Sequence, residues 1–321
     1  MTNDVQAIAF RLAVLFLVVL AGWTARRLRW LGEPATRMLS RLCVDVCFPC
    51  LTFTQMLHIV GGRPLAEQGG VVALGAIMML VALLAGRAAL GGLSDGVRRT
   101  AWLAMATPNW IFFPLPIATL LYGADGLAAV LLMNVSAQFF LWTSCVAILR
   151  GFRSTARAGF VNILNPALVA TFAGAALALG WPASRDWPEA TGALGHVFDL
   201  LKTAGTLTIP LSMLVTGSQL GALARGWRID PPLLRVNAAR LVIIPLITLL
   251  VFRLLAPWLS LPPDIWRTAL LIAAMPVAVS CGVLVERFGG DRNFISQSIL
   301  LTTVAALVTV PALMLLAKFI Y

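Results

Sequence analysis

Apolar and polar positions follow one another along the chain in long blocks. Apolar stretches of roughly 20 residues, the length that crosses a bilayer as a helix, are separated by short segments with charged residues, Gly or Pro. These stretches predict ten membrane-spanning helices, over residues 6–25, 36–57, 69–90, 98–121, 126–149, 158–180, 192–220, 233–256, 266–287 and 293–319. No segment is left over for a soluble domain, so we expect an all-α integral membrane protein.

Composition agrees with this interpretation. Of the 321 residues, 60% are hydrophobic and only 12% are charged, whereas soluble proteins are nearer half apolar and a quarter charged. The net charge of +11 could suggest a nucleic-acid partner, but the basic residues gather in the short connections between predicted spans. The charge therefore indicates topology, and we expect the lipid bilayer and no nucleic acid as a partner.

The connections differ in their basic residues. Those after the odd-numbered spans, with the span ends beside them, hold 16 Lys and Arg, and those after the even-numbered spans hold 4. Basic connections stay in the cytoplasm. We therefore predict a multi-pass protein of the cell (inner or plasma) membrane with both termini outside.

The fourth predicted span is interrupted by proline. Its sequence from Thr107 to Gly123 reads TPNWIFFPLPIATLLYG, in which Pro108, Pro114 and Pro116 each lack a backbone donor and clash with the preceding turn. Unwound backbone is tolerated within a membrane only where protein buries it or where it lines a cavity. We expect this helix to be broken at a substrate site.

A second segment repeats the same features. Residues 273–291, AAMPVAVSCGVLVERFGGD, also place a proline, Pro276, after an Ala/Met run and end in aromatic-Gly-small-Asp. Pro49 in FPCL and Pro210 in IPLS make a further matching pair. We predict two five-helix repeats, over residues 1–150 and 151–321.

An odd number of spans in each repeat requires the second repeat to insert upside down. Inverted repeats with Gly- or Pro-interrupted helices at matching places are typical of secondary transporters. The fold prediction is therefore ten helices in two inverted five-helix repeats, with broken helices 4 and 9 crossing each other.

The order of these motifs resembles the auxin efflux carrier family, within the group that shares the bile acid sodium symporter fold. The residues that carry the resemblance are Asn165, Pro166, Gly174, Pro210, Gly217, Leu220, Pro276, Phe288, Gly289, Thr302, Thr303, Thr309 and Pro311. In the fourth span, Ile111 and Pro114 stand where the family has glycines. The resemblance implies an organic anion as substrate, a scaffold of spans 1, 2, 6 and 7, an elevator-like movement of the other spans, and a homodimer.

The expected substrate-binding residues lie in and beside the two interrupted segments: Asn109, Pro108, Pro114, Pro116, Pro276, Ser280 and Gly282. Asn109 is the first choice for substrate contact, although its amide could instead satisfy backbone groups that the break frees. The N-termini of half-helices favour an anion, so a carboxylate needs no buried arginine there.

Charged residues within the spans are candidates for coupling or gating. Asp199 and Lys202 lie three residues apart in one span, and could relay a proton, gate the site, form a structural ion pair, or let the lysine reach an interface. Asp45, four residues after Arg41, is a third coupling candidate or a partner in an interfacial ion pair. Arg240 lies near the predicted cytoplasmic start of its span, where we expect it to meet lipid headgroups.

Metal and cofactor chemistry is not indicated. Cys43, Cys47 and Cys50 have no histidine beside them, and Cys often serves as a small hydrophobe in helices, so we expect no metal and no cofactor.

The sequence favours a secondary transporter, not an enzyme, that moves a small organic anion such as a dicarboxylate or an auxin-like acid by alternating access, as efflux or with protons. One alternative is a sodium-coupled symporter of the bile acid type, although the unwound segments offer no carboxylate. Alternatives of another class are an intramembrane enzyme and a non-transporting membrane sensor.

Overall fold

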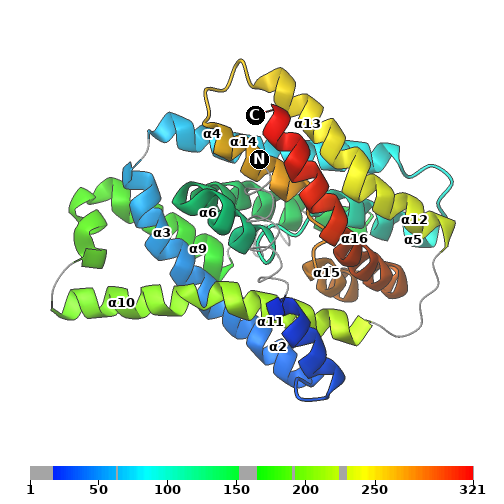
Figure 1. Ribbon diagram of the computed structural model, residues 1–321, viewed down its shortest axis with the longest axis horizontal. Coiled ribbons are helices and arrows are strands. Elements are labelled where there is room, and N and C mark those ends of the chain that lie inside the picture. Colours follow the sequence, from blue (N-terminus) through cyan, green and yellow to red (C-terminus); the bar gives the residue numbers. More distant parts are fainter. Residues whose placement is uncertain (1–16, 63, 152–164, 190–191, 224–229, 321) are drawn as a thin grey trace. The chain divides into compact units, whose positions relative to one another are not determined.

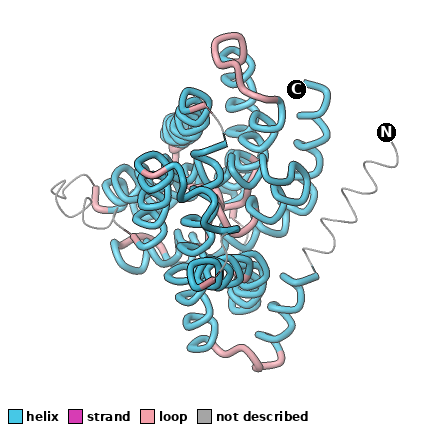
Figure 2. Tube along the Cα trace, turned by 90° about the vertical axis from the view of Figure 1, so that its left-hand side faces the viewer, coloured by secondary structure: helices cyan, strands magenta, loops and turns pink. Residues whose placement is uncertain are grey.

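The computed structural model describes residues 17–62, 64–151, 165–189, 192–223 and 230–320. Within these ranges the chain is helical, with short loops and one isolated bridge in place of strands (Figure 2). Six of the described helices are long and apolar enough to cross a membrane: Glu33–Val60, Leu65–Ala88, Pro114–Leu149, Ala193–Ala222, Pro231–Leu255 and Arg292–Leu316. The prediction of an all-α protein with several membrane spans is confirmed.

The other four predicted spans are not among these six helices, either because part of the span lies outside the described residues or because the span is broken. Spans 6–25 and 158–180 lie partly outside the described residues, and the described part of the latter is a shorter apolar helix, Pro166–Gly180. Spans 98–121 and 266–287 are broken into shorter helices. The count of ten, and the inverted relation of the halves, stay predictions.

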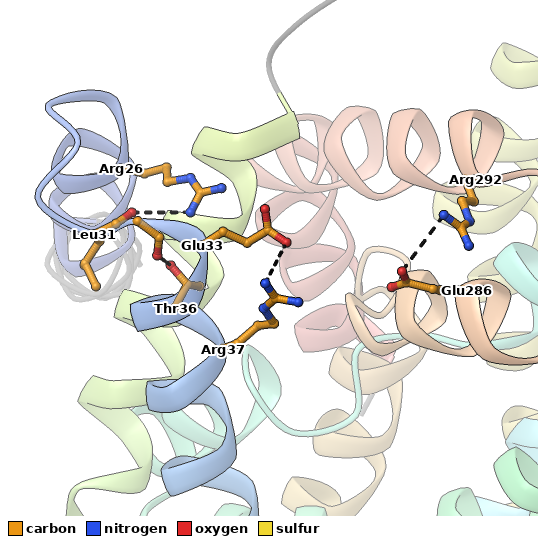
Figure 3. A network of polar contacts seen from close by, with 8 residues as sticks. Arg26, Leu31, Glu33, Thr36, Arg37, Glu286 and Arg292 are labelled. Carbon is orange, nitrogen blue, oxygen red and sulfur yellow. Dashed lines mark hydrogen bonds and ion pairs between the residues drawn. The ribbon is translucent and has the colours of Figure 1, made fainter.

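The described chain divides into two compact units. The first contains most of α4 (Leu65–Ala88) and the helices that follow it up to residue 151, together with those after residue 230 (Figure 1). These are α5 (Asp95–Ala106), α6 (Pro114–Phe140), η2 (Leu141–Cys145), α7 (Val146–Leu149), α12 (Pro231–Ala238), η4 (Ala239–Ile243), α13 (Ile244–Leu255), α14 (Pro263–Ala273), α15 (Ser280–Phe288) and α16 (Arg292–Ile320). An exposed ion pair of 3.9 Å, Glu286–Arg292, links α15 to α16 (Figure 3).

The second unit contains a helix over residues 17–27, the helices between residues 33 and 62, and the helices between residues 166 and 221. These are α2 (Glu33–Leu42), η1 (Cys43–Cys47), α3 (Phe48–Gly62), α9 (Pro166–Gly180), η3 (Pro182–Glu189), α10 (Ala193–Thr206) and α11 (Thr208–Leu223). On α2 an exposed ion pair of 3.4 Å joins Arg37 to Glu33 (Figure 3). Exposed pairs of this kind add little stability.

Glycines of the second unit allow close helix packing. A Cβ on Gly174 of α9 would lie 2.7 Å from the Phe53 carbonyl oxygen of α3, and one on Gly217 of α11 would lie 1.8 Å from the Val19 carbonyl oxygen. Membrane helices that pack through small residues bring their backbones together in this way. Each compact unit takes segments from both halves of the sequence, and the division into repeats at residue 150 stays a prediction.

Prolines explain irregular turns in three of the long helices. The π-helical turns η1 and η4 lie just before Pro49 and Pro245, and α10 ends at Thr206, four residues before Pro210. A proline leaves the carbonyl four residues earlier without its helical partner, so the preceding turn widens or breaks. The matched prolines Pro49 and Pro210 thus disturb their helices at equivalent positions.

Candidate functional site

The first predicted break is present in the structure. Helix α5 ends at Ala106, and α6 begins at Pro114. The seven residues between them, 107–113, are not helical. Pro114 occupies the first turn of α6, where its missing N–H and fixed φ favour a helix start. This half-helix ends at Gly123, whose φ of 61° interrupts α6.

The second break matches the first. Helix α14 ends at Ala273, and α15 begins at Ser280 and ends before Gly289, which has a φ of 92°. Positive φ is a conformation that glycine adopts without the clash of a Cβ. The half-helices after the breaks, residues 114–122 and 280–288, are each nine residues long and end in an equivalent glycine.

The two breaks cross each other. Pro108 and Val277 form an antiparallel bridge, the Asn109 N–H donates to the Pro276 carbonyl at 2.8 Å, and the Ala278 N–H donates to the Thr107 carbonyl at 3.1 Å. We call residues 107–113 and 274–279 together the crossover. Backbone groups freed by one break are thus satisfied by the other, which is how unwound backbone becomes tolerable within a membrane.

The two polar atoms of the Asn109 side chain differ in their hydrogen bonding within the crossover. Its Oδ1 accepts a hydrogen bond of 3.1 Å from the Phe112 N–H, so part of the amide satisfies freed backbone. The side chain is 2% exposed, and its Nδ2 is among the buried atoms of the described chain with no hydrogen-bond partner. A buried donor without a partner costs free energy, so it is a candidate for ligand contact.

Two threonine hydroxyls connect the crossover to neighbouring helices of the same unit. Thr302 of α16 accepts a hydrogen bond of 3.1 Å from the Val277 N–H through its Oγ1, and Thr107 lies with its hydroxyl 3.5 Å from the Cys145 sulfur of η2. Thr302 is one of the residues that carried the family resemblance, and its contact gives that motif a physical role.

Arg240 lies at the crossover, and the prediction that it meets lipid headgroups was wrong. It is 0% exposed, on η4. Its Nη1 donates to the Met105 carbonyl at 3.2 Å, its Nε and Nη2 donate to the Met275 carbonyl at 3.2 Å each, and Nη2 also donates to the Ala273 carbonyl. Its place in the sequence predicted a position at the membrane interface, but packing against the broken helices of its own unit buries the side chain.

The crossover is positively polarised. The N-terminal ends of the half-helix at Pro114 and of α15 at Ser280 follow it directly, and helix N-termini carry partial positive charge. Arg240 adds a full positive charge, which offsets the partial negative charge of the C-terminal ends of α5 and α14, and among the described residues no Asp or Glu side chain is buried. This arrangement suits an anion better than a cation.

The other expected substrate-binding residues occupy distinct places around the crossover. Pro276 lies within it, Pro116 is buried in the first turn of α6, and Ser280 is exposed as the first residue of α15. A Cβ on Gly282 would meet only the Ile299 side chain, at 3.7 Å, so this glycine is not required by packing. Their contact with a substrate stays a prediction.

The expected coupling residues belong to the second unit. Asp45 lies on η1, and Asp199 and Lys202 lie on α10, with all three side chains exposed. In the described part of the chain no ion pair joins Asp199 to Lys202 or Asp45 to Arg41. Their role in coupling stays a prediction.

Comparison with known proteins identifies the family of the chain. The family described as "Membrane transport protein" matches residues 7–159 and again residues 158–314, once in each half of the chain. The chain belongs to this family. The predicted resemblance to the auxin efflux carrier family is confirmed, and the double match fits two repeats.

A relative from Methanothermobacter thermautotrophicus supports the same assignment. It is 27% identical over 317 residues, which cover 94% of this chain and 95% of the relative, and its name is "Uncharacterized transporter". Family and relative together indicate a membrane transporter, a class that is generally not enzymatic.

Proposed function

We propose that this family member is a secondary transporter that carries a small organic anion by alternating access, with the crossover as its substrate site. The observation that carries the proposal is the positive character of the crossover. Two half-helix N-termini meet there, Arg240 offsets the partial negative charge of the C-terminal ends of α5 and α14, and no buried carboxylate among the described residues opposes the positive ends.

Asn109 supports the anion as substrate. Its Oδ1 is occupied by the Phe112 N–H, which leaves the Nδ2 hydrogens as free donors. Carboxylate oxygens are acceptors, and hydrogen bonds between an amide donor and a charged group are stronger than neutral ones. The unit that carries the crossover would move with its substrate, and the second unit, which holds the described parts of spans 1, 2, 6 and 7 of the prediction, would be the scaffold.

A thermal-shift screen tests the substrate class. The detergent-purified full chain is melted with mono-, di- and tricarboxylates, with organic cations and with neutral sugars, each in sodium and in choline buffer. A ligand at a hundred times its dissociation constant stabilises a protein by about 2.7 kcal/mol, which is a measurable rise in melting temperature. We expect a carboxylate to raise the melting temperature equally in both buffers, and to be taken up by proteoliposomes.

The same screen separates the alternatives. Stabilisation by a carboxylate only in sodium would favour a sodium-coupled symporter, and stabilisation by cations or sugars alone would contradict an anion site. Asn109→Ser, melted beside the wild type, serves as a matched control because serine can still accept from the Phe112 N–H but lacks the amide donors.

A further inference from the structure

The guanidinium of Arg240 joins the C-terminal ends of two half-helices. Its acceptors are the Met105 carbonyl, in the last turn of α5, and the Ala273 and Met275 carbonyls, at and just beyond the end of α14. The last four carbonyls of a helix have no intrahelical partner and carry partial negative charge. Arg240 therefore satisfies and neutralises both ends at one point.

Carbonyls in this situation are typical ligands of a bound cation. In transporters with broken helices, unwound carbonyls and half-helix C-termini coordinate the coupling ion. A guanidinium offers five donors in a rigid fork and stays charged, so one arginine can fill such a carbonyl cluster. Arg240 lies in the π-helical turn before Pro245, and its side chain is buried.

We propose that Arg240 is a tethered cation that takes the place of a mobile one at the crossover. It holds the C-terminal ends of α5 and α14 together, and its fixed charge excludes sodium from the same carbonyls. This role goes beyond the proposed transport of an anion. It concerns what holds the ends of α5 and α14 together, whatever the substrate is. The deletion of the side chain should accordingly create a site for an added cation.

Native thiols of the first unit provide a readout that needs no substrate. Cys145 of η2 and Cys281 of α15 are both 0% exposed. Cys145 lies 3.5 Å from the Thr107 hydroxyl in the crossover, and the backbone N–H of Cys281 donates to the Ala278 carbonyl of the crossover. Cys43, buried in the second unit, reports general unfolding.

The experiment measures the N-ethylmaleimide labelling rate of each cysteine by mass spectrometry of the full chain in detergent. In Arg240→Ala we expect labelling of Cys145 and Cys281 to rise about ten- to a hundredfold, since hydrogen bonds to a charged group are lost, with Cys43 unchanged. Low millimolar guanidinium should return both rates toward wild type, and choline at equal ionic strength should not. Arg240→Lys, which keeps the charge but offers only the donors of one nitrogen, should label more slowly than Arg240→Ala.

Arg235→Ala is the matched control, because Arg235 lies on the same helical segment but is exposed and donates to the Gly91 carbonyl. It should label like the wild type, and exchange of sodium for choline should leave the wild-type rates unchanged. The proposal is overturned if Arg240→Ala labels like the wild type, or if guanidinium slows its labelling no more than choline does. It is also overturned if the labelling rate of Cys43 rises with the other two rates, or if sodium slows the labelling of the wild type. Should Arg240→Ala not fold, Arg240→Lys decides, since rapid labelling of that variant also contradicts a role of the charge. Failure to find an anion substrate would leave all these outcomes unaffected.

Discussion

At the scale of single residues, the Asn109 side chain uses its oxygen in the fold and leaves its nitrogen buried without a hydrogen-bond partner. The oxygen that accepts from the Phe112 N–H could be replaced by a serine oxygen, whereas the Nδ2 donors could not. We therefore expect Asn109→Ser to melt close to the wild type, and Asn109→Ala to melt lower because it loses the hydrogen bond from the Phe112 N–H. In both variants substrate affinity should fall about ten- to a hundredfold, the worth of a hydrogen bond to a charged group.

Proteoliposome uptake beside a melting curve measures the two effects separately. The matched control is Asn165→Ser, because Asn165 also accepts through Oδ1 from the backbone N–H three residues later, Leu168, at 3.0 Å, but in the second unit. It should leave affinity unchanged. Wild-type affinity in Asn109→Ser would show that Nδ2 does not contact the substrate.

Asp199 is the residue on which proton coupling can be tested. If it takes part in proton movement, Asp199→Asn removes the group that exchanges the proton, so transport should lose its pH dependence while the protein still folds. Uptake across a pH series measures this, with Asp186→Asn as the control, since Asp186 is an exposed acid of the same unit on η3. An unchanged pH profile with normal activity would assign Asp199 to a structural role.

At the scale of elements, the broken helices were predictable because their cause is local. Prolines in an apolar run forbid a straight helix whatever surrounds them, and the glycines that end the two half-helices could be matched from sequence alone. The location of Arg240 could not be predicted in this way. Its burial depends on contacts with α5 and α14, which are far from it in sequence. A charged residue inside an apolar span was itself the signal that a functional role should be the default.

The break itself can be removed. Pro108→Ala with Pro114→Ala restores backbone donors at both positions and allows α5 to continue toward α6, which would destroy the pairing of Asn109 with Pro276. We expect the double variant to reach the membrane and to lose transport. Pro311→Ala, which changes a proline inside the continuous helix α16, is the control and should transport normally. Normal transport by the double variant would reduce the break to a tolerated kink.

At the scale of the whole molecule, the distribution of basic residues makes a prediction that the helices alone do not. Connections after odd-numbered spans hold 16 Lys and Arg against 4 in the others, so both termini should face outside. A C-terminal fusion to a reporter that is active only in the cytoplasm should therefore stay silent in intact cells. An active fusion would mean that the orientation, or the number of spans, is wrong.

Single cysteines in two described connections distinguish these two errors. Ala183→Cys lies in η3, in the sixth connection, and Ser94→Cys lies before α5, in the third; both positions are exposed. A maleimide that cannot cross membranes should label intact cells at position 183 and not at position 94, measured against the wild type with its five cysteines. A reversed protein exchanges the two labelling results, whereas a span miscounted after residue 183 changes the C-terminal reporter alone, so the pair of experiments distinguishes these two errors.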